Sequence, residues 1–143
     1  MKTSTIPVQA PAWYIVDAAD QKLGRVAAKV AHVLKGKHKA SYSPHQLCGD
    51  CVIIINVEKL DISANKAMKK VYFHHTGYPG HMQRKTLAKM LEKSPVVVME
   101  KAIQGMLAPG RQRSQILKRL HVIQGSEHKY APQKPVPLDI STL

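Results

Sequence analysis

The sequence predicts an α/β fold built around a parallel β-sheet, and three observations lead to this prediction. Residues 13–16 (WYIV) form an aromatic and β-branched run that is typical of a strand. Residues 23–35 carry apolar side chains at the three-and-four spacing of an amphipathic helix. Residues 51–57 (CVIIINV) are continuously apolar, which indicates a strand buried on both faces. Strand, helix and strand in this order predict one right-handed crossover unit.

The helix over 23–35 has recognisable ends and two chemically different faces. Asp20 is placed to cap its start, because a carboxylate can accept the first unpaired backbone N–H groups. Lys35 stands in the last turn and Gly36 just beyond it, which is a common way to end a helix. The predicted buried face consists of Leu23, Val26, Ala27, Val30, Val33 and Leu34. The opposite face carries Lys22, Arg25, Lys29 and His32.

Shorter elements are predicted for the remainder of the chain. Residues 60–63 suit a short edge strand closed by a turn at 64–66, and residues 71–73 begin another extended segment. Pro95 suits a first helical position, and Pro109-Gly110 breaks the helix that follows. The patterns further predict a loop over 74–81, helices over 86–93, 95–106 and 112–119, and a last strand over 120–123.

Length and composition favour one domain with its own core. The chain has 143 residues, of which 44% are hydrophobic, so it is long enough to bury about two-thirds of its unfolded surface. We expect an extended N-terminal arm over 1–12, a single α/β domain over 13–125, and an extended C-terminal tail over 126–143 that lies on the domain surface. No apolar run approaches the roughly 18 residues that span a bilayer, and no secretory signal is evident. We therefore expect a soluble, intracellular protein without a membrane partner.

The charge distribution predicts a polyanionic partner. The formal net charge is +13, for which RNA, DNA and anionic lipid are the candidate partners. Acidic residues are absent from three long windows, at 21–49, 62–91 and 101–126, and each window is rich in Lys and Arg. A merely soluble surface usually mixes the two signs. Segregation into several windows indicates several contacts with one large anion.

Two of these windows combine cations with aromatic rings, which favours nucleic acid. The first contains GKHKASYSPH at 36–45, and the second contains KKVYFHHTGYPGHMQRK at 69–85. Lysine and arginine pair with phosphates, and a tyrosine ring can stack on an unpaired base. Charge alone does not separate RNA from DNA, because the 2′-hydroxyl contacts that distinguish them leave no mark in a sequence.

Other chemistries are less well supported. Cys48 and Cys51 form a CxxC with His45 nearby, but no second pair completes a zinc site, so we expect Cys51 to be a small buried apolar residue and Cys48 to lie in a loop. His74 and His75 are the candidates for an enzyme that processes nucleic acids, although no carboxylate stands near them in sequence. The turn after the first strand matches neither phosphate-binding glycine motif, so no nucleotide cofactor is expected. We also expect no metal and no small-molecule substrate.

Several runs, taken together in order, resemble one protein family. They are WYIVDA at 13–18, LGRVA at 23–27, GKHK with Tyr42, Pro44 and His45, GD at 49–50, KVYFHHTGYPG at 70–80, GML at 105–107, LKRLHV at 117–122 and SEH at 126–128. This set is similar to the family of bacterial large-subunit ribosomal protein thirteen. The resemblance implies a three-layer α/β/α domain around a small, mainly parallel sheet of about four strands.

The resemblance also implies a function and a set of contacts. It implies a non-catalytic constituent of the large ribosomal subunit, on cytoplasmic ribosomes, that binds large-subunit ribosomal RNA early in assembly beside neighbouring ribosomal proteins. A messenger-RNA-binding regulator outside the ribosome is an alternative that the residues do not separate from this one. Replacing Lys37 and Lys39 by alanine is expected to weaken RNA binding and leave the fold intact. The candidate RNA-binding residues are Lys22, Arg25, Lys29, Lys35, Lys37, His38, Lys39, Tyr42, His45, Lys69, Lys70, His74, His75, Tyr78, Arg84, Lys85, Arg111, Arg113, Lys118, Arg119, His128 and Lys129.

Overall fold

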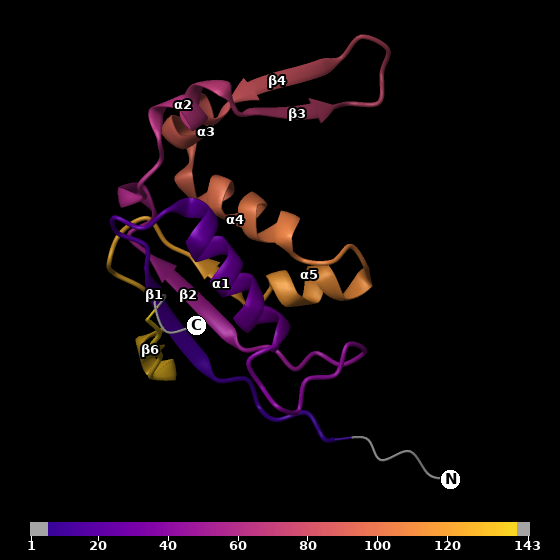
Figure 1. The fold of residues 1–143 in the computed structure, drawn as a ribbon, viewed down its shortest axis with the longest axis vertical. Helices are drawn as coiled ribbons and strands as arrows, with labels where there is room; N and C mark the ends of the chain where they lie inside the picture. Colours follow the sequence, from indigo (N-terminus) through magenta and orange to yellow (C-terminus); the bar gives the residue numbers. More distant parts are fainter. Residues whose placement is uncertain (1–5, 140–143) are drawn as a thin grey trace.

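A four-stranded parallel sheet lies at the centre of the computed structural model, which describes residues 6–139 (Figure 1). The strands are β1 (Trp13–Asp17), β2 (Cys51–Ile55), β5 (Leu120–Val122) and β6 (Val136–Pro137), in the spatial order β5-β2-β1-β6. All three neighbouring pairs run parallel. The α/β class, the mainly parallel sheet and its number of strands are therefore as the sequence and the resemblance predict.

Five α-helices and a separate hairpin complete the described chain. The hairpin pairs β3 (Val71–His75) with β4 (Met82–Thr86) in antiparallel register and projects from the body in Figure 1. The helices are α1 (Leu23–Lys35), α2 (Ala64–Lys69), α3 (Leu87–Lys93), α4 (Pro95–Met106) and α5 (Arg111–Leu117), with short 3₁₀ helices η1 (Val57–Lys59) and η2 (Ala131–Gln133). No helix within residues 6–139 is both long enough and apolar enough to cross a membrane.

The helix α1 has the predicted bounds but not the predicted N-cap. Gly36 ends it in the left-handed conformation, with φ of 81°, as expected from its lack of a Cβ. Asp20 does not cap the start. It adopts φ of 57° in the preceding turn, and Lys22 occupies the N-cap position without a side-chain hydrogen bond. The prediction of an Asp20 cap is therefore wrong, because Gln21 and Lys22 separate Asp20 from the first helical residue.

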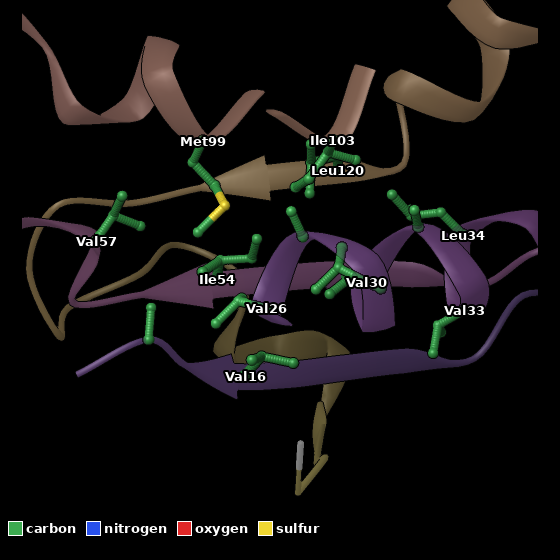
Figure 2. Close-up of a cluster of buried hydrophobic side chains, with 14 of the residues drawn as sticks. Val16, Val26, Val30, Val33, Leu34, Ile54, Val57, Met99, Ile103 and Leu120 are labelled. Atoms are coloured by element: carbon green, nitrogen blue, oxygen red, sulfur yellow. The ribbon is translucent and has the colours of Figure 1, made fainter. Parts of the chain in front are cut away.

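One continuous core joins α1 and α4 to a single face of the sheet. Val26 and Val30 of α1 lie beside Ile54 of β2, while Met99 and Ile103 of α4 close the cluster from above in Figure 2. These side chains are almost completely buried. At about 25 cal/mol per Å² of apolar surface, each such side chain contributes on the order of 2 kcal/mol of burial free energy. Helix α5 contributes partly buried residues to the edge of the same cluster.

The second face of the sheet is covered by the C-terminal segment. The rings of His121 on β5, Trp13 on β1 and Tyr130 form a cluster of three: the His121 centroid lies 5.5 Å from that of Trp13 and 4.3 Å from that of Tyr130, and the Trp13 and Tyr130 centroids lie 5.5 Å apart. Tyr130 also shares a hydrogen bond of 3.0 Å with His121 Nδ1. The chain must pass from β5 at one edge to β6 at the other, and a right-handed crossover in that direction places the connection on this face. The fold therefore has three layers, with the outer layer on this face formed by η2 and its flanking loops.

Three segments differ from the predictions. Residues 60–63 do not form a strand, and only an isolated bridge joins Lys22 to Asp61. The predicted turn at 64–66 is the beginning of α2. The predicted loop over 74–81 is shorter, because His74 and His75 continue β3 and a second strand, β4, follows the turn.

The tail contributes to the sheet as well as lying on its surface. The sequence indicates only a surface tail after residue 125, yet Val136 and Pro137 pair with Tyr14 and Ile15 as the edge strand β6. The Leu138 N–H also donates to the Ile15 carbonyl oxygen at 2.9 Å. A proline suits an edge strand, where its missing N–H leaves no partner unsatisfied.

Candidate nucleic-acid interface

A buried carboxylate organises the first basic loop. Asp50 is fully buried at the start of β2, and its Oδ1 accepts hydrogen bonds from Lys39 Nζ at 2.6 Å and from the Ala12 N–H at 2.8 Å. Its Oδ2 lies 2.8 Å from His38 Nε2. A buried carboxylate is stable only when it is paired and hydrogen-bonded. Asp50 therefore ties the loop, the N-terminal segment and the sheet together.

The end of this loop packs tightly on the end of α1. A Cβ on Gly49 would lie 1.7 Å from the Leu34 carbonyl oxygen, and one on Gly36 would lie 2.8 Å from the Cys48 carbonyl carbon. Only glycine permits these approaches. Arg119, just before β5, donates from its guanidinium to the carbonyl oxygens of Leu47 and Gly49. The end of the loop is thus held by the main chain of α1 on one side and by the Arg119 side chain on the other.

These contacts divide the predicted RNA-binding residues of the first window into two groups. His38 and Lys39 are engaged by the fold, since their side chains hold Asp50, and Arg119 of the third window is engaged in the same way by the loop carbonyls. The Lys39 side chain is only 16% exposed. Lys37, between Gly36 and His38, is exposed. We therefore expect that Lys37, but not Lys39, can be replaced without affecting the fold.

The first and third basic windows meet at a cleft of about 380 Å³ between the loop and the α4–α5 turn, here called the loop cleft. Its floor is apolar, with Leu34 and Ile116 among its lining residues. Gln112 fastens the two sides, because its Nε2 donates to the His45 carbonyl oxygen at 2.8 Å. The predicted RNA-binding residues that line this cleft are Lys35, Tyr42, Arg111 and Arg113. Residues about 70 positions apart in sequence thus form one surface that offers both cations and an aromatic ring.

The outer face of α1 carries the predicted cations. Lys22, Arg25 and His32 are exposed, and Lys29 is half-buried beside them. The opposite face of the same helix is buried in the core. The amphipathic pattern therefore gives the correct orientation for all four residues.

The β3–β4 hairpin presents two different faces. Directly paired residues of an antiparallel ladder share a face, so Phe73, Arg84, His75 and Met82 lie together, with the Arg84 guanidinium 5.7 Å from the Phe73 ring centroid. Phe73 is 63% exposed and Tyr78, at the tip, is 71% exposed. Large exposed aromatic rings next to cations are suited to stacking on bases.

The remaining candidates are distributed over the surface. His74, on the other face of the hairpin, is paired with Gln83, and His75 Nδ1 accepts the Gly77 N–H at 2.9 Å. The two histidines point to opposite faces of β3, as expected for neighbours in a strand. Also exposed are His45, Lys69, Lys70, Lys85, Lys118 and Lys129, whereas His128 is half-buried near Tyr130. The sequence-derived list omits Lys66 and Lys101, which the fold places beside Lys22 and Lys70.

The cysteines take the structural role that we expect. Cys48 and Cys51 are both buried free thiols, and Cys48 lies in the loop. Burial raises the pKa of the Cys51 thiol; of the smaller effects, the nearby charge of Arg119 lowers this pKa and that of Asp50 raises it. A thiol with a raised pKa is a poor nucleophile. Among the described residues, no group of three or more His, Cys, Asp or Glu is arranged to hold a metal ion.

Comparison with known proteins gives a consistent result. A family model described as "Ribosomal protein L13" matches residues 11–129. The chain is 46% identical over 128 residues to a large ribosomal subunit protein uL13 from Alkalilimnicola ehrlichii, covering 90% of each chain. It is 47% identical over 128 residues to the uL13 of Symbiobacterium thermophilum, again covering 90% of each chain. Identity to the uL13 of a Geobacillus species is 48% over 123 residues, covering 86% of this chain and 85% of the relative.

Proposed function

Because this chain belongs to the ribosomal protein L13 family, we propose that it is a structural constituent of the large ribosomal subunit and binds the RNA of that subunit. Its role is non-catalytic, and its place is on the cytoplasmic ribosome, beside other proteins of the large subunit. We further propose that it binds this RNA early in assembly.

The observation that carries this proposal is the convergence of unbalanced cations at the loop cleft. Lys35 from the first acid-free window meets Arg111 and Arg113 from the third. No carboxylate lines this cleft among the described residues. A phosphate backbone supplies the missing negative charge, and the Tyr42 ring offers a surface for an unpaired base.

The rigid attachment of the loop also supports RNA binding. Asp50 and Arg119 fix the loop in the free protein, so little conformational entropy is lost when Lys37 and Tyr42 meet the RNA. The hairpin adds a second, separate contact, because its exposed rings and cations lie well away from the loop (Figure 1). Two distant contacts suit a protein that holds several RNA helices in one arrangement.

The decisive experiment measures binding of the full chain to a large-subunit ribosomal RNA transcript at several salt concentrations. If roughly six to ten phosphates are engaged, affinity falls about a thousandfold or more between 50 and 200 mM salt. Replacing both Arg111 and Arg113 by glutamine should weaken binding and reduce the salt slope by about two. The matched control replaces the exposed Lys59 and Lys93, which lie outside the loop cleft. Weak binding without a steep salt slope for the unaltered protein would refute the proposal.

A further inference from the structure

A second cleft, with a volume of about 640 Å³, opens where α1, α2, α3 and α4 meet. Its apolar lining includes Leu23, Leu87 and Met106. Four lysines also line it, namely Lys22, Lys66, Lys70 and Lys101. We call it the lysine cleft. They lie in all three acid-free windows, and Asp61 is the one acidic side chain among the described lining residues.

Two of these lysines are brought together by one aromatic ring. The ammonium groups of Lys70 and Lys101 lie 5.2 and 5.6 Å from the ring centroid of Tyr72. The ring attracts both cations, but it does not neutralise them. Neighbouring ammonium groups repel each other in the free protein. An anion in the cleft would reduce this repulsion.

The start of α1 adds to the positive potential of the cleft. Lys22 is the N-cap, no side-chain hydrogen bond caps the helix, and the first turn has no acidic residue. The helix runs for 13 residues, so its dipole places partial positive charge at this end. Gly24 also lines the cleft, and nothing lies within 4 Å of the position that a Cβ would occupy there. An anion can therefore approach the helix start closely.

We propose that the lysine cleft binds the sugar–phosphate backbone of large-subunit ribosomal RNA, with a phosphodiester group at the start of α1. This inference rests on the proposed function and adds to it a contact surface distinct from the loop cleft. An RNA backbone fits better than a small anion, because the cleft combines an apolar floor for the ribose with four cations spread around its rim. Lys66 and Lys101 thereby become RNA-contacting residues.

The first test measures the binding of a variant in which Lys66 and Lys101 are both replaced by alanine. We expect affinity for the large-subunit RNA transcript to fall roughly tenfold or more at 150 mM salt, and the salt slope to fall by about two. The control variant, with Lys59 and Lys93 replaced by alanine, loses the same charge outside the cleft and should change much less. Urea unfolding of both variants shows whether each has kept the fold.

The outcomes of this test separate the two proposals. If the unaltered protein binds with a steep salt dependence and both variants lose affinity equally, the proposal that RNA binds in the lysine cleft is overturned and the proposed function stands. Absence of steep binding by the unaltered protein would overturn both. If the double alanine variant does not fold, Lys66→Glu alone gives the answer, because Lys66 is exposed on α2 and makes no ion pair that the structure describes. We expect it to bind more weakly than Lys59→Glu.

The second test locates the cleft relative to the RNA. Both native thiols are buried, so a cysteine placed at Met106, which lines the cleft and is 47% exposed, can carry a tethered Fe(II) cleavage reagent selectively. In the complex with full-length protein, we expect strong backbone cleavage confined to one short RNA region. The control probe stands at Glu58, on the exposed side of η1. Cleavage from Met106 no stronger than from Glu58 would overturn the proposal.

Discussion

The ammonium group of Lys39 lies 2.6 Å from a carboxylate oxygen of Asp50, and that carboxylate is fully buried. The pair gives two lysines of one loop different roles. Lys39 turns inward and stabilises the loop, whereas Lys37 stays exposed and is available to a phosphate. An excess of positive charge in a sequence therefore overstates the number of cations that a partner can use.

Replacing Asp50 by asparagine should destabilise the fold. The substitution leaves Lys39 without its countercharge in a mostly buried position, which typically costs about 2–4 kcal/mol. Urea unfolding at fixed pH and salt measures this loss. Lys39→Ala should also destabilise the protein, while Lys37→Ala should leave the unfolding midpoint within experimental error. A midpoint for Asp50→Asn equal to that of the unaltered protein would show that the buried pair is unimportant for stability.

Replacing Lys37 by alanine should weaken RNA binding without affecting stability. Loss of one phosphate contact lowers the salt slope by about one and lowers affinity several-fold, whatever the RNA sequence nearby. Filter binding over a salt series gives both quantities. Lys37→Arg, which keeps the charge, is the matched control and should bind nearly as well as the original. An unchanged slope for Lys37→Ala would mean that this side chain does not contact phosphate.

Replacing Gly49 by alanine should be among the most damaging single substitutions. The new Cβ would lie 1.7 Å from the Leu34 carbonyl oxygen, so the loop and the end of α1 must separate. We expect a loss of about 3 kcal/mol or more in the free energy of unfolding. Gly105→Ala in α4, where nothing lies within 4 Å of the Cβ position, is the control and should be neutral or stabilising. Similar stabilities for the two variants would contradict the packing described here.

The stability of the protein should fall as the pH decreases below about 6.5, in part because of His121. Burial lowers the pKa of His121 from its ordinary value of 6.5, so the unfolded chain binds this proton more readily than the folded one. The stabilising contribution is complete above 6.5 and is lost progressively as the pH falls towards the folded pKa. His121→Phe keeps an aromatic ring packed against Trp13 and Tyr130 but cannot titrate. Unfolding experiments between pH 5 and pH 7.5 should therefore show that stability depends less on pH in the variant. If stability depended equally on pH in both proteins, the titration of His121 would not contribute to it.

The two cysteines should react slowly with thiol reagents in the folded protein. Both are buried, and burial raises the pKa of Cys51, so little thiolate is accessible at neutral pH. Colour development with an aromatic disulfide reagent should become rapid only after urea is added. Fast labelling of either residue under native conditions would indicate that the 48–51 segment opens readily.

Part of the fold is predictable from sequence because its signals are local. Helix α1 follows from the apolar spacing of its buried face and from Gly36 at its end. Strand β2 follows from a continuous apolar run. Strand β4 is missed because Met82–Thr86 is exposed and mostly polar, and its pairing with β3 depends on the partner strand alone. Strand β6 is missed because two residues carry no periodicity, and their conformation depends on the open edge of β1.

The candidate site is predictable as a composition but not as an arrangement. Acid-free windows identify the basic segments. They do not reveal that Asp50, directly after the first window, forms hydrogen bonds with the side chains of His38 and Lys39. They also do not show that Lys66 and Lys101 share a cleft, because 35 residues of chain separate them and the hairpin and α3 lie between. Such relationships exist only once the tertiary structure has formed.

The pairing of β6 with β1, together with the stack of Tyr130 on His121, has a consequence for how the chain reaches its final form during synthesis. Translation delivers β1, β2 and the helices first, so the nascent domain leaves the exit tunnel with one sheet edge unpaired and one sheet face uncovered. Residues 130–137 then close both at once. Premature termination before Tyr130 would thus yield a product inclined to self-association, because the edge of β1 and the second face of the sheet would both stay exposed.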